Sequence, residues 1–204
     1  MRGIWTLVLV GVLVGAIGSL AQQPVTAKAL APVPAKAIAL VKVGALDDAL
    51  VTRVENFVKS DLGIPVHVLA PQESADESLD QIGARVAKLM GPQDVACVAI
   101  VLPKTENKAH GVFLPENKVS VLNAGALKPA NGDAEVFGRR LEKETMQSIG
   151  MLLGLQVCPN PECAMSSYSG DNGLDAKGRN YCPPCRDKFM KAAAAKGLSF
   201  KTTP

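Results

Sequence analysis

Apolar residues follow two spacings in the first half of the chain, and the spacing predicts which element each segment forms. Three short apolar runs have the length of buried strands: residues 37–43, 64–69 and 95–102. Apolar residues at helical spacing predict one helix over Asp47–Ser60, followed by Gly63, and another from Leu79 to Met90, ended by Gly91-Pro92. This alternation of strands and helices predicts a largely parallel sheet.

A hairpin pattern follows the last of these strands. The runs Gly111–Leu114 and Val119–Leu122 flank Pro115–Lys118, a sequence typical of turns. A hairpin joins its strands in antiparallel fashion, so the sheet should be mixed. The sequence therefore predicts an α/β fold.

Two more helices are predicted towards the C-terminus. Residues Glu135–Leu155 form a long helical pattern with Gly154 as its stop signal. Its expected buried stripe consists of Phe137, Leu141, Thr145, Ile149 and Leu152. The alanine- and lysine-rich segment Arg186–Lys196 predicts a final helix that ends at Gly197.

Residues 1–21 have the pattern of an export signal. Arg2 supplies a positive start, Ile4–Leu20 is almost wholly apolar, and Ala21 is a small residue at the expected cleavage site. The apolar run is longer than usual for a signal, so an uncleaved membrane anchor over residues 3–21 is the alternative. We expect an exported protein, periplasmic or extracellular, with the membrane as a partner only if this segment stays attached.

The remaining chain divides into a spacer and one domain. Residues 22–36 are rich in alanine and proline and lack apolar periodicity, which is typical of a flexible spacer. Residues 37–204 are sufficient for one domain with its own core. The formal net charge is +3 without a dense basic run, so we expect no nucleic-acid partner.

Four of the five cysteines form two close pairs. Cys158 and Cys163 are separated by four residues, and Cys182 and Cys185 by two. Two such pairs set apart in sequence are the pattern of a tetrahedral zinc-thiolate site, so we predict one structural zinc ion bound by all four. Disulfide bonds are the alternative, because export leads to an oxidising environment.

The same segment resembles the archaemetzincins, a family of zinc metallopeptidases of the metzincin clan. Their signature is HExxHxxGxxHCxxxxCxM, followed after a loop by CxxC. The positions that match it here are Gly154, Cys158, Cys163, Met165, Cys182 and Cys185. The resemblance implies a metzincin-like mixed sheet, an active-site-type helix and a C-terminal four-cysteine zinc lobe.

The catalytic residues of that signature are replaced in this sequence. The three histidine positions hold Gln147, Met151 and Val157, and the glutamate position holds Ser148. A catalytic zinc ion on a helix needs two histidines four residues apart, with a carboxylate beside the first to activate water. Glutamine and methionine are poor ligands for such an ion, valine offers no donor, and serine cannot act as the general base. We therefore predict no catalytic residues.

We expect structural roles for the histidines, for Met165 and for the fifth cysteine. His67 and His110 are the only histidines and cannot supply a three-histidine site, so a structural or solvated role is expected for each. Met165 matches the methionine that lies beneath the metal in metzincins, and without that metal we expect it in the core. Cys97 lies in an apolar strand and should be a buried free thiol.

The resemblance also indicates a groove. In metzincins an antiparallel edge strand lines the substrate cleft, which makes Val112, Phe113 and Leu114 the candidate strand, although an ordinary edge strand fits the same residues. The replacements at the site are uncharged, so the empty site would be a mostly apolar groove for an extended peptide or protein segment. The alternative is that Met151 fills the space.

The sequence therefore predicts an exported, catalytically inactive archaemetzincin-like protein with one structural zinc ion and a candidate peptide-binding groove. Two alternatives differ in class. One is an active zinc metallopeptidase with an unorthodox site. The other is a structural or redox module based on the Cys182–Cys185 pair.

Overall fold

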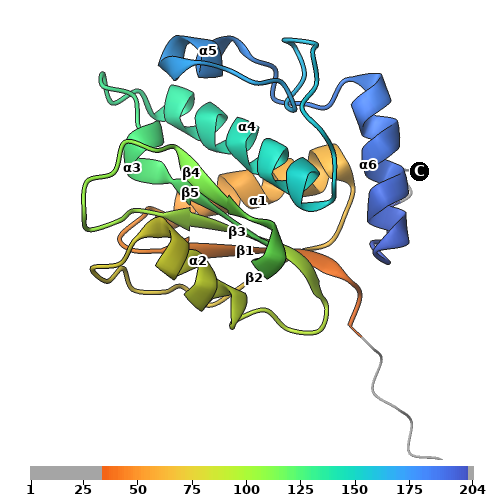
Figure 1. The fold of residues 1–204 in the computed structure, drawn as a ribbon, viewed down its shortest axis with the longest axis horizontal. Helices are drawn as coiled ribbons and strands as arrows, with labels where there is room; N and C mark the ends of the chain where they lie inside the picture. Colours follow the sequence, from red (N-terminus) through yellow and green to blue (C-terminus); the bar gives the residue numbers. More distant parts are fainter. Residues whose placement is uncertain (1–33, 202–204) are drawn as a thin grey trace, which may run out of the picture. The chain divides into compact units, whose positions relative to one another are not determined.

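A five-stranded sheet in the order β2-β1-β3-β5-β4 forms the centre of the computed structural model, which describes residues 34–201 (Figure 1). The predicted export segment and residues 22–33 of the spacer lie outside the described residues. The strands are β1 (Ala37–Val43), β2 (Val66–Val68), β3 (Asp94–Val101), β4 (Gly111–Leu114) and β5 (Val119–Asn123). The predicted α/β class with a mixed sheet is confirmed.

Strand direction follows the connections. The pairs β1–β2, β1–β3 and β3–β5 are parallel, whereas β4 pairs with β5 antiparallel and forms one edge of the sheet. The predicted hairpin is present, and its turn is a short 3₁₀ helix, Pro115–Asn117, followed by Lys118 at a φ of 56°. Every residue of β3 from Ala96 to Val101 is buried, as expected for a central strand covered on both faces.

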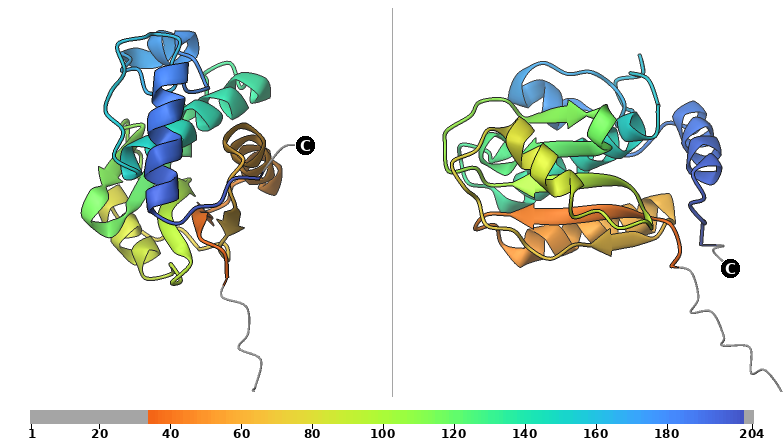
Figure 2. Two further views of the ribbon diagram at one scale, coloured as in Figure 1. Left: turned by 90° about the vertical axis from the view of Figure 1, so that its right-hand side faces the viewer. Right: turned by 60° about the horizontal axis from the view of Figure 1, so that its bottom comes forward.

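Helices cover both faces of the sheet (Figures 1 and 2). Helices α1 (Asp48–Leu62) and α4 (Ala134–Leu152) pack on one face, where their apolar residues meet the side chains of β1 and β3. Helix α2 (Leu79–Ala87) packs on the other face. The shorter helices are α3 (Ala124–Leu127), α5 (Gly170–Ala176) and α6 (Pro183–Ala195).

The helix ends have local causes. The Asp47 carboxylate accepts a hydrogen bond from the Ala49 amide at the start of α1, and Gly63 follows its end in the left-handed conformation, as expected for a glycine stop signal. Helix α4 ends at Leu152 rather than at Leu155. The Leu153 amide donates back to the last turn, and Gly154, at a φ of 93°, then turns the chain out of the helix.

Other predicted boundaries were too wide. Helix α2 ends at Ala87 instead of Met90, and β2 covers Val66–Val68 instead of residues 64–69. Pro65 has no amide to donate, and only its carbonyl joins the sheet, accepting from Ile38. The short helices α3 and α5 were not predicted, because neither has enough residues to show a helical period.

Helix α4 is buried both along its apolar stripe and on the opposite, charged side. Leu141, Thr145 and Ile149 of the predicted stripe have no exposed surface, whereas Phe137 and Leu152 are only half-buried. The opposite side is covered by the segment 166–181, which includes α5. Buried residues of α4 therefore include charged ones: Arg140, Glu142, Lys143 and Glu144.

These charges are paired with the covering segment. Arg140 donates to Asp175 at 2.7 Å through two nitrogens and to Asp171 at 2.9 Å. The Lys143 ammonium donates to the carbonyls of Leu174 and Asp175, at 3.0 and 2.7 Å. A buried charge is tolerated only with such partners, so these contacts fix α5 on α4.

None of the described helices is both long and apolar enough to span a bilayer.

We predict that Arg140→Ala lowers the free energy of unfolding by about 2–3 kcal/mol, because it leaves Asp175 without its cation while that carboxylate keeps some contact with water. Urea denaturation followed by circular dichroism measures the change. The matched control is Arg139→Ala, since the Arg139 side chain is 45% exposed against 4% for Arg140. Equal losses for the two variants would contradict the assigned role.

Candidate metal centre and adjoining groove

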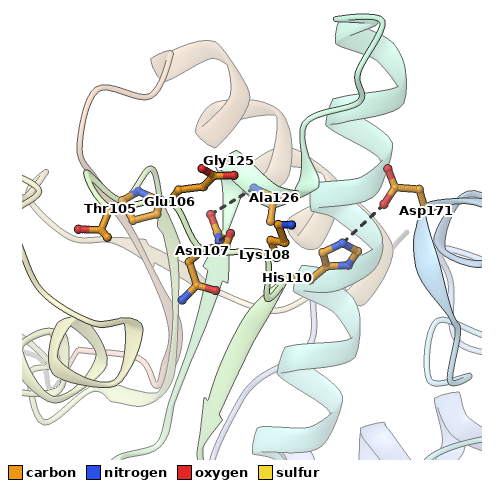
Figure 3. Close-up of a pocket in the computed structure, with 10 residues that line it drawn as sticks. Thr105, Glu106, Asn107, Lys108, His110, Gly125, Ala126 and Asp171 are labelled. Atoms are coloured by element: carbon orange, nitrogen blue, oxygen red, sulfur yellow. Dashed lines mark hydrogen bonds and ion pairs between the residues drawn. The ribbon is translucent and has the colours of Figure 1, made fainter.

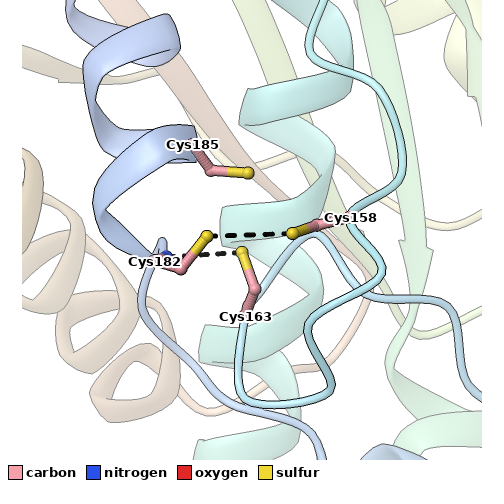
Figure 4. Close-up of side chains that lie close together, drawn as sticks. All are labelled: Cys158, Cys163, Cys182 and Cys185. Atoms are coloured by element: carbon pink, nitrogen blue, oxygen red, sulfur yellow. Dashed lines mark hydrogen bonds between the residues drawn. The ribbon is translucent and has the colours of Figure 1, made fainter.

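Four thiols meet between the end of α4 and the start of α6 (Figure 4). The sulfur atoms of Cys158, Cys163, Cys182 and Cys185 all lie within 4.8 Å of one another, and those of Cys158 and Cys182 are 3.7 Å apart. A tetrahedral zinc ion with Zn–S bonds of about 2.3 Å places its sulfurs about 3.8 Å apart. This cysteine cluster therefore fits one zinc ion without rearrangement of the chain.

The local backbone supports thiolates at the cluster. The amides of Met165 and Cys182 both donate to Cys163 Sγ, each at 3.4 Å. Burial raises the pKa of Cys163, and it opposes ionisation of Cys182 as well, but hydrogen bonds from the Cys185 amide and the neighbouring thiols lower the pKa of Cys182 overall. All five cysteines are free thiols in this structure.

The cluster is joined to α4 through buried contacts. Tyr181, next to Cys182, donates its hydroxyl proton to the carbonyl of Met146 at 2.6 Å. The Cys158 amide donates to the carbonyl of Met165 at 2.9 Å. Met165 is fully buried against Gly150 of α4, where a larger residue would collide with it, so its expected place in the core is confirmed.

A groove of about 240 Å³ lies between edge strand β4 and α4. Its lining comes from three parts of the chain: His110, Gly111, Val112 and Phe113; Ser120 and Leu122; Glu144, Gln147, Ser148, Met151 and Tyr168. Two residues of the candidate strand, Val112 and Phe113, thus line it, whereas Leu114 does not. Met151 borders the groove without filling it, so the closed alternative is not what the structure adopts.

The structure separates the four positions at which the sequence analysis expects replaced catalytic residues. Gln147, Ser148 and Met151 come together in the groove, as their spacing on one helix implies. Val157 does not join them. Its side chain is 57% exposed and borders a different, apolar pocket beside the cysteine cluster.

The groove is less apolar than predicted, because one wall is a chain of polar contacts. The buried Lys177 ammonium donates to Gln147 at 2.5 Å and to Glu144 at 3.2 Å. Glu144 also accepts from the Tyr168 hydroxyl at 3.0 Å, and that hydroxyl lies 2.9 Å from Nδ1 of His110. Burial lowers the pKa of Lys177, and Glu144 opposes this by favouring the charged form.

Sequence reasoning missed this wall. The available signal was the charged run Glu142-Lys143-Glu144, which lies between Leu141 and Thr145 of the predicted buried stripe. Charges at such positions require partners, and the partners come from the sequence between the two cysteine pairs. His110 joins this network through its contact with Tyr168 and lines the groove. His67 pairs with the buried Asp94 at 2.9 Å and is not part of the groove.

The polar groups of the groove floor bond to one another and to the backbone. Ser148 Oγ lies 2.8 Å from Ser120 Oγ, which also donates to the Val112 carbonyl at 3.5 Å. Both carboxylate oxygens of Glu144 are already bonded, to Lys177 and Tyr168. Elsewhere in the described chain, Cys97 is fully buried, and burial raises the pKa of its thiol to about 12.

Beyond His110 the surface continues into a second, polar pocket of about 360 Å³ (Figure 3). The loop between β3 and β4 forms much of it, with Thr105, Asn107 and Lys108, and His110 lines both pockets. Asp171 lies across from His110, with 3.6 Å between its carboxylate and Nε2. The groove therefore opens at this end towards polar side chains.

The backbone of β4 is available for pairing on its groove side. The Asn123 amide donates to the His110 carbonyl at 2.8 Å, and the register pairs Gly111 with Leu122. Hydrogen-bonded pairs alternate along an antiparallel ladder. The amide and carbonyl groups of Gly111 and Phe113 therefore point away from β5, towards the open edge.

Comparisons with known proteins identify similar chains. The profile of a family described as Peptidase family M54 matches residues 105–191. An archaemetzincin of Thermococcus kodakarensis is 29% identical over 122 residues, which are 56% of this chain and 62% of that protein. An archaemetzincin of Pyrococcus horikoshii is 33% identical over 92 residues, covering 43% of this chain and 49% of that protein. The matches thus span only about half to three fifths of these relatives.

Solved structures extend the likeness to the fold. The crystal structure of an archaemetzincin from Methanopyrus kandleri superposes with a TM-score of 0.61 over 78% of this chain and 96% of that one, at 20% identity. A zinc-dependent peptidase from Methanocorpusculum labreanum gives a TM-score of 0.60 over 74% and 99% of the two chains, also at 20% identity. The predicted metzincin-like fold is confirmed.

We predict one zinc ion per chain, lost in Cys182→Ser. Structural zinc contributes on the order of 10 kcal/mol in small zinc-stabilised folds, so this variant should lose order at least around the cysteine cluster and α6. Elemental analysis after gel filtration measures the metal, and hydrogen exchange locates the loss of order. Cys97→Ser, which changes a thiol outside the cluster, is the control and should keep its zinc. Wild-type protein that contains no zinc and two disulfide bonds would contradict the prediction.

Proposed function

We propose that the chain, a member of the archaemetzincin family of zinc metallopeptidases, no longer hydrolyses peptides and instead binds them. In this proposal the zinc ion at the cysteine cluster is structural, and the groove between β4 and α4 is the binding site.

The proposed loss of catalysis rests on the types of side chain at the floor of the groove. Gln147, Ser148 and Met151 occupy the places where the signature of the family has its ligands and its base. Metal-assisted hydrolysis needs a bound ion with an open position for water and a base to deprotonate that water. The cysteine cluster does not replace such a site, because four thiolates fill the coordination sphere of zinc.

The open groove supports peptide binding. An extended segment laid along β4 would pair with the free backbone groups of Gly111 and Phe113 and so add a strand to the sheet. Its alternate side chains would face Phe113, Leu122 and Met151, which are apolar. Lys177 neutralises Glu144 in the wall, so the segment we propose is uncharged and apolar on the side that enters the groove.

We also propose that the protein acts outside the cytoplasm. This part of the proposal rests on the sequence of residues 1–21, with Arg2 followed by the long apolar run.

We predict no metal-dependent hydrolysis of peptides. Purified protein with zinc bound is incubated with a broad peptide library, and products are sought by mass spectrometry with and without a chelator. Hydrolysis that a chelator removes and that Gln147→Ala abolishes would show an active peptidase with an unorthodox site, and would refute the proposed loss of catalysis.

We predict that the groove binds extended apolar peptides weakly, and that Met151→Arg abolishes this binding. The arginine side chain would occupy the groove and place a charge where the peptide needs an apolar contact. Amide chemical shifts of residues 111–114 during titration with a peptide library measure the effect. The control is Met190→Arg, which introduces the same side chain at a position on α6 that is 43% exposed and outside the groove.

Shift changes that are equal in the wild type and in Met151→Arg would mean that peptides bind elsewhere. No shift changes at residues 111–114 with any peptide at millimolar concentration would end the proposal of a binding groove, and would leave the predicted zinc content unaffected.

A further inference from the structure

The cysteine cluster has a buried side and a solvent side. Cys163 and Cys185 are 0% and 5% exposed, whereas Cys158 and Cys182 are half-buried. An open pocket of about 360 Å³ lies directly over the cluster and is lined by Cys158, Cys182 and Cys185. Its other walls are mostly apolar and include Val157, Pro159, Pro183 and Pro184. A small neutral molecule therefore reaches the sulfurs of Cys158 and Cys182 from solvent.

These two thiols are also well placed to react with each other. Their sulfurs are 3.7 Å apart, so an approach of about 1.6 Å completes a disulfide bond. Cys182 is the N-cap residue of α6, a position where the helix dipole favours a thiolate. The sulfur of Cys158 belongs to the other cysteine pair, so a bond between them removes one ligand from each pair.

We propose that the zinc centre is a redox-sensitive release switch, in which a peroxide joins Cys158 to Cys182 and the zinc ion leaves. The proposal rests on zinc binding by the cysteine cluster and is independent of peptide binding in the groove.

The chemistry balances with hydrogen peroxide as the oxidant. The Cys182 thiolate attacks one peroxide oxygen, the O–O bond breaks, and a sulfenic acid and one hydroxide ion form. The Cys158 thiolate then attacks the sulfur of the sulfenic acid and displaces a second hydroxide ion. Two electrons pass from the two sulfurs to the peroxide. Zinc keeps only the thiolates of Cys163 and Cys185, too few for its tetrahedral site, and dissociates.

Release of zinc would loosen one wall of the groove. The segment 166–181 lies between Met165 and Cys182, and the cysteines on either side of it hold it in place. Tyr168 and Lys177 in this segment carry the contacts to Glu144 and Gln147. Loss of the metal therefore removes the restraint at the two ends of this segment, while the contacts of Arg140 with α5 remain.

The test uses the full chain with zinc bound, titrated with hydrogen peroxide. Released zinc is followed with a chromogenic chelator, and disulfide bonds are mapped by mass spectrometry after digestion. We expect one zinc ion and one Cys158–Cys182 disulfide bond per chain at about equimolar peroxide, with zinc rebinding after reduction. Hydrogen exchange should rise in the segment 166–181 and stay unchanged in β1 and β3.

A conservative variant separates this pathway from general oxidation. Cys158→His keeps a zinc ligand but has no thiol to complete the bond, and it should release zinc at least about tenfold more slowly at the same peroxide concentration. Cys97→Ser, which lacks the fifth thiol of the chain, should behave like the wild type.

Three results would overturn the proposal. The first is retention of zinc by the wild type in millimolar peroxide. The second is a disulfide bond mapped to Cys182–Cys185, which would favour a redox module based on that pair. The third is equally fast zinc release by Cys158→His. If Cys158→His fails to bind zinc, the disulfide bonds mapped in the wild type still show whether Cys182 is joined to Cys158 or to Cys185.

Discussion

The rest of the structure depends on the burial of α4 on nearly every side. One face packs against the sheet, and the other carries Arg140, Lys143 and Glu144, which are also buried. Charged groups in such a position need partners, because an unpaired buried charge costs several kcal/mol. The segment 166–181 supplies carbonyls, carboxylates and the Lys177 ammonium, so these polar contacts help to set its course over the helix, together with the buried side chains of Leu174 and Tyr181.

The cysteine cluster and the groove are therefore connected by one segment, residues 166–181. The cysteines bracket the segment 166–181, and the segment places Tyr168 and Lys177 against the groove side of α4. The contacts that support this arrangement are separate from two of the four signature positions at which the sequence analysis expects replaced catalytic residues. The zinc-thiolate site, the buried ion pairs and the core under Met165 do not involve Ser148 or Val157.

Much of the fold could be predicted from the sequence because its strands and long helices have strong local signals. The strand Ala37–Val43 was predicted at its observed limits, and Asp47 and Gly63 mark the ends of α1 through capping. The cysteine cluster followed from spacing alone. The short helix α5 could not be predicted because it has too few residues to show a helical period. The polar wall of the groove could not be predicted because it arises from contacts between Glu144 and residues more than twenty positions away. The outward position of Val157 likewise depends on the turn after Gly154, which spacing does not describe.

The open edge of β4 has a consequence for self-association. Free backbone groups on an edge strand invite pairing with another sheet, and soluble proteins usually block such edges. Here the edge is only the four residues Gly111–Leu114, and α4 with Tyr168 faces it across the groove. The short strand and the helix across the groove therefore limit the pairing of this edge with a second sheet.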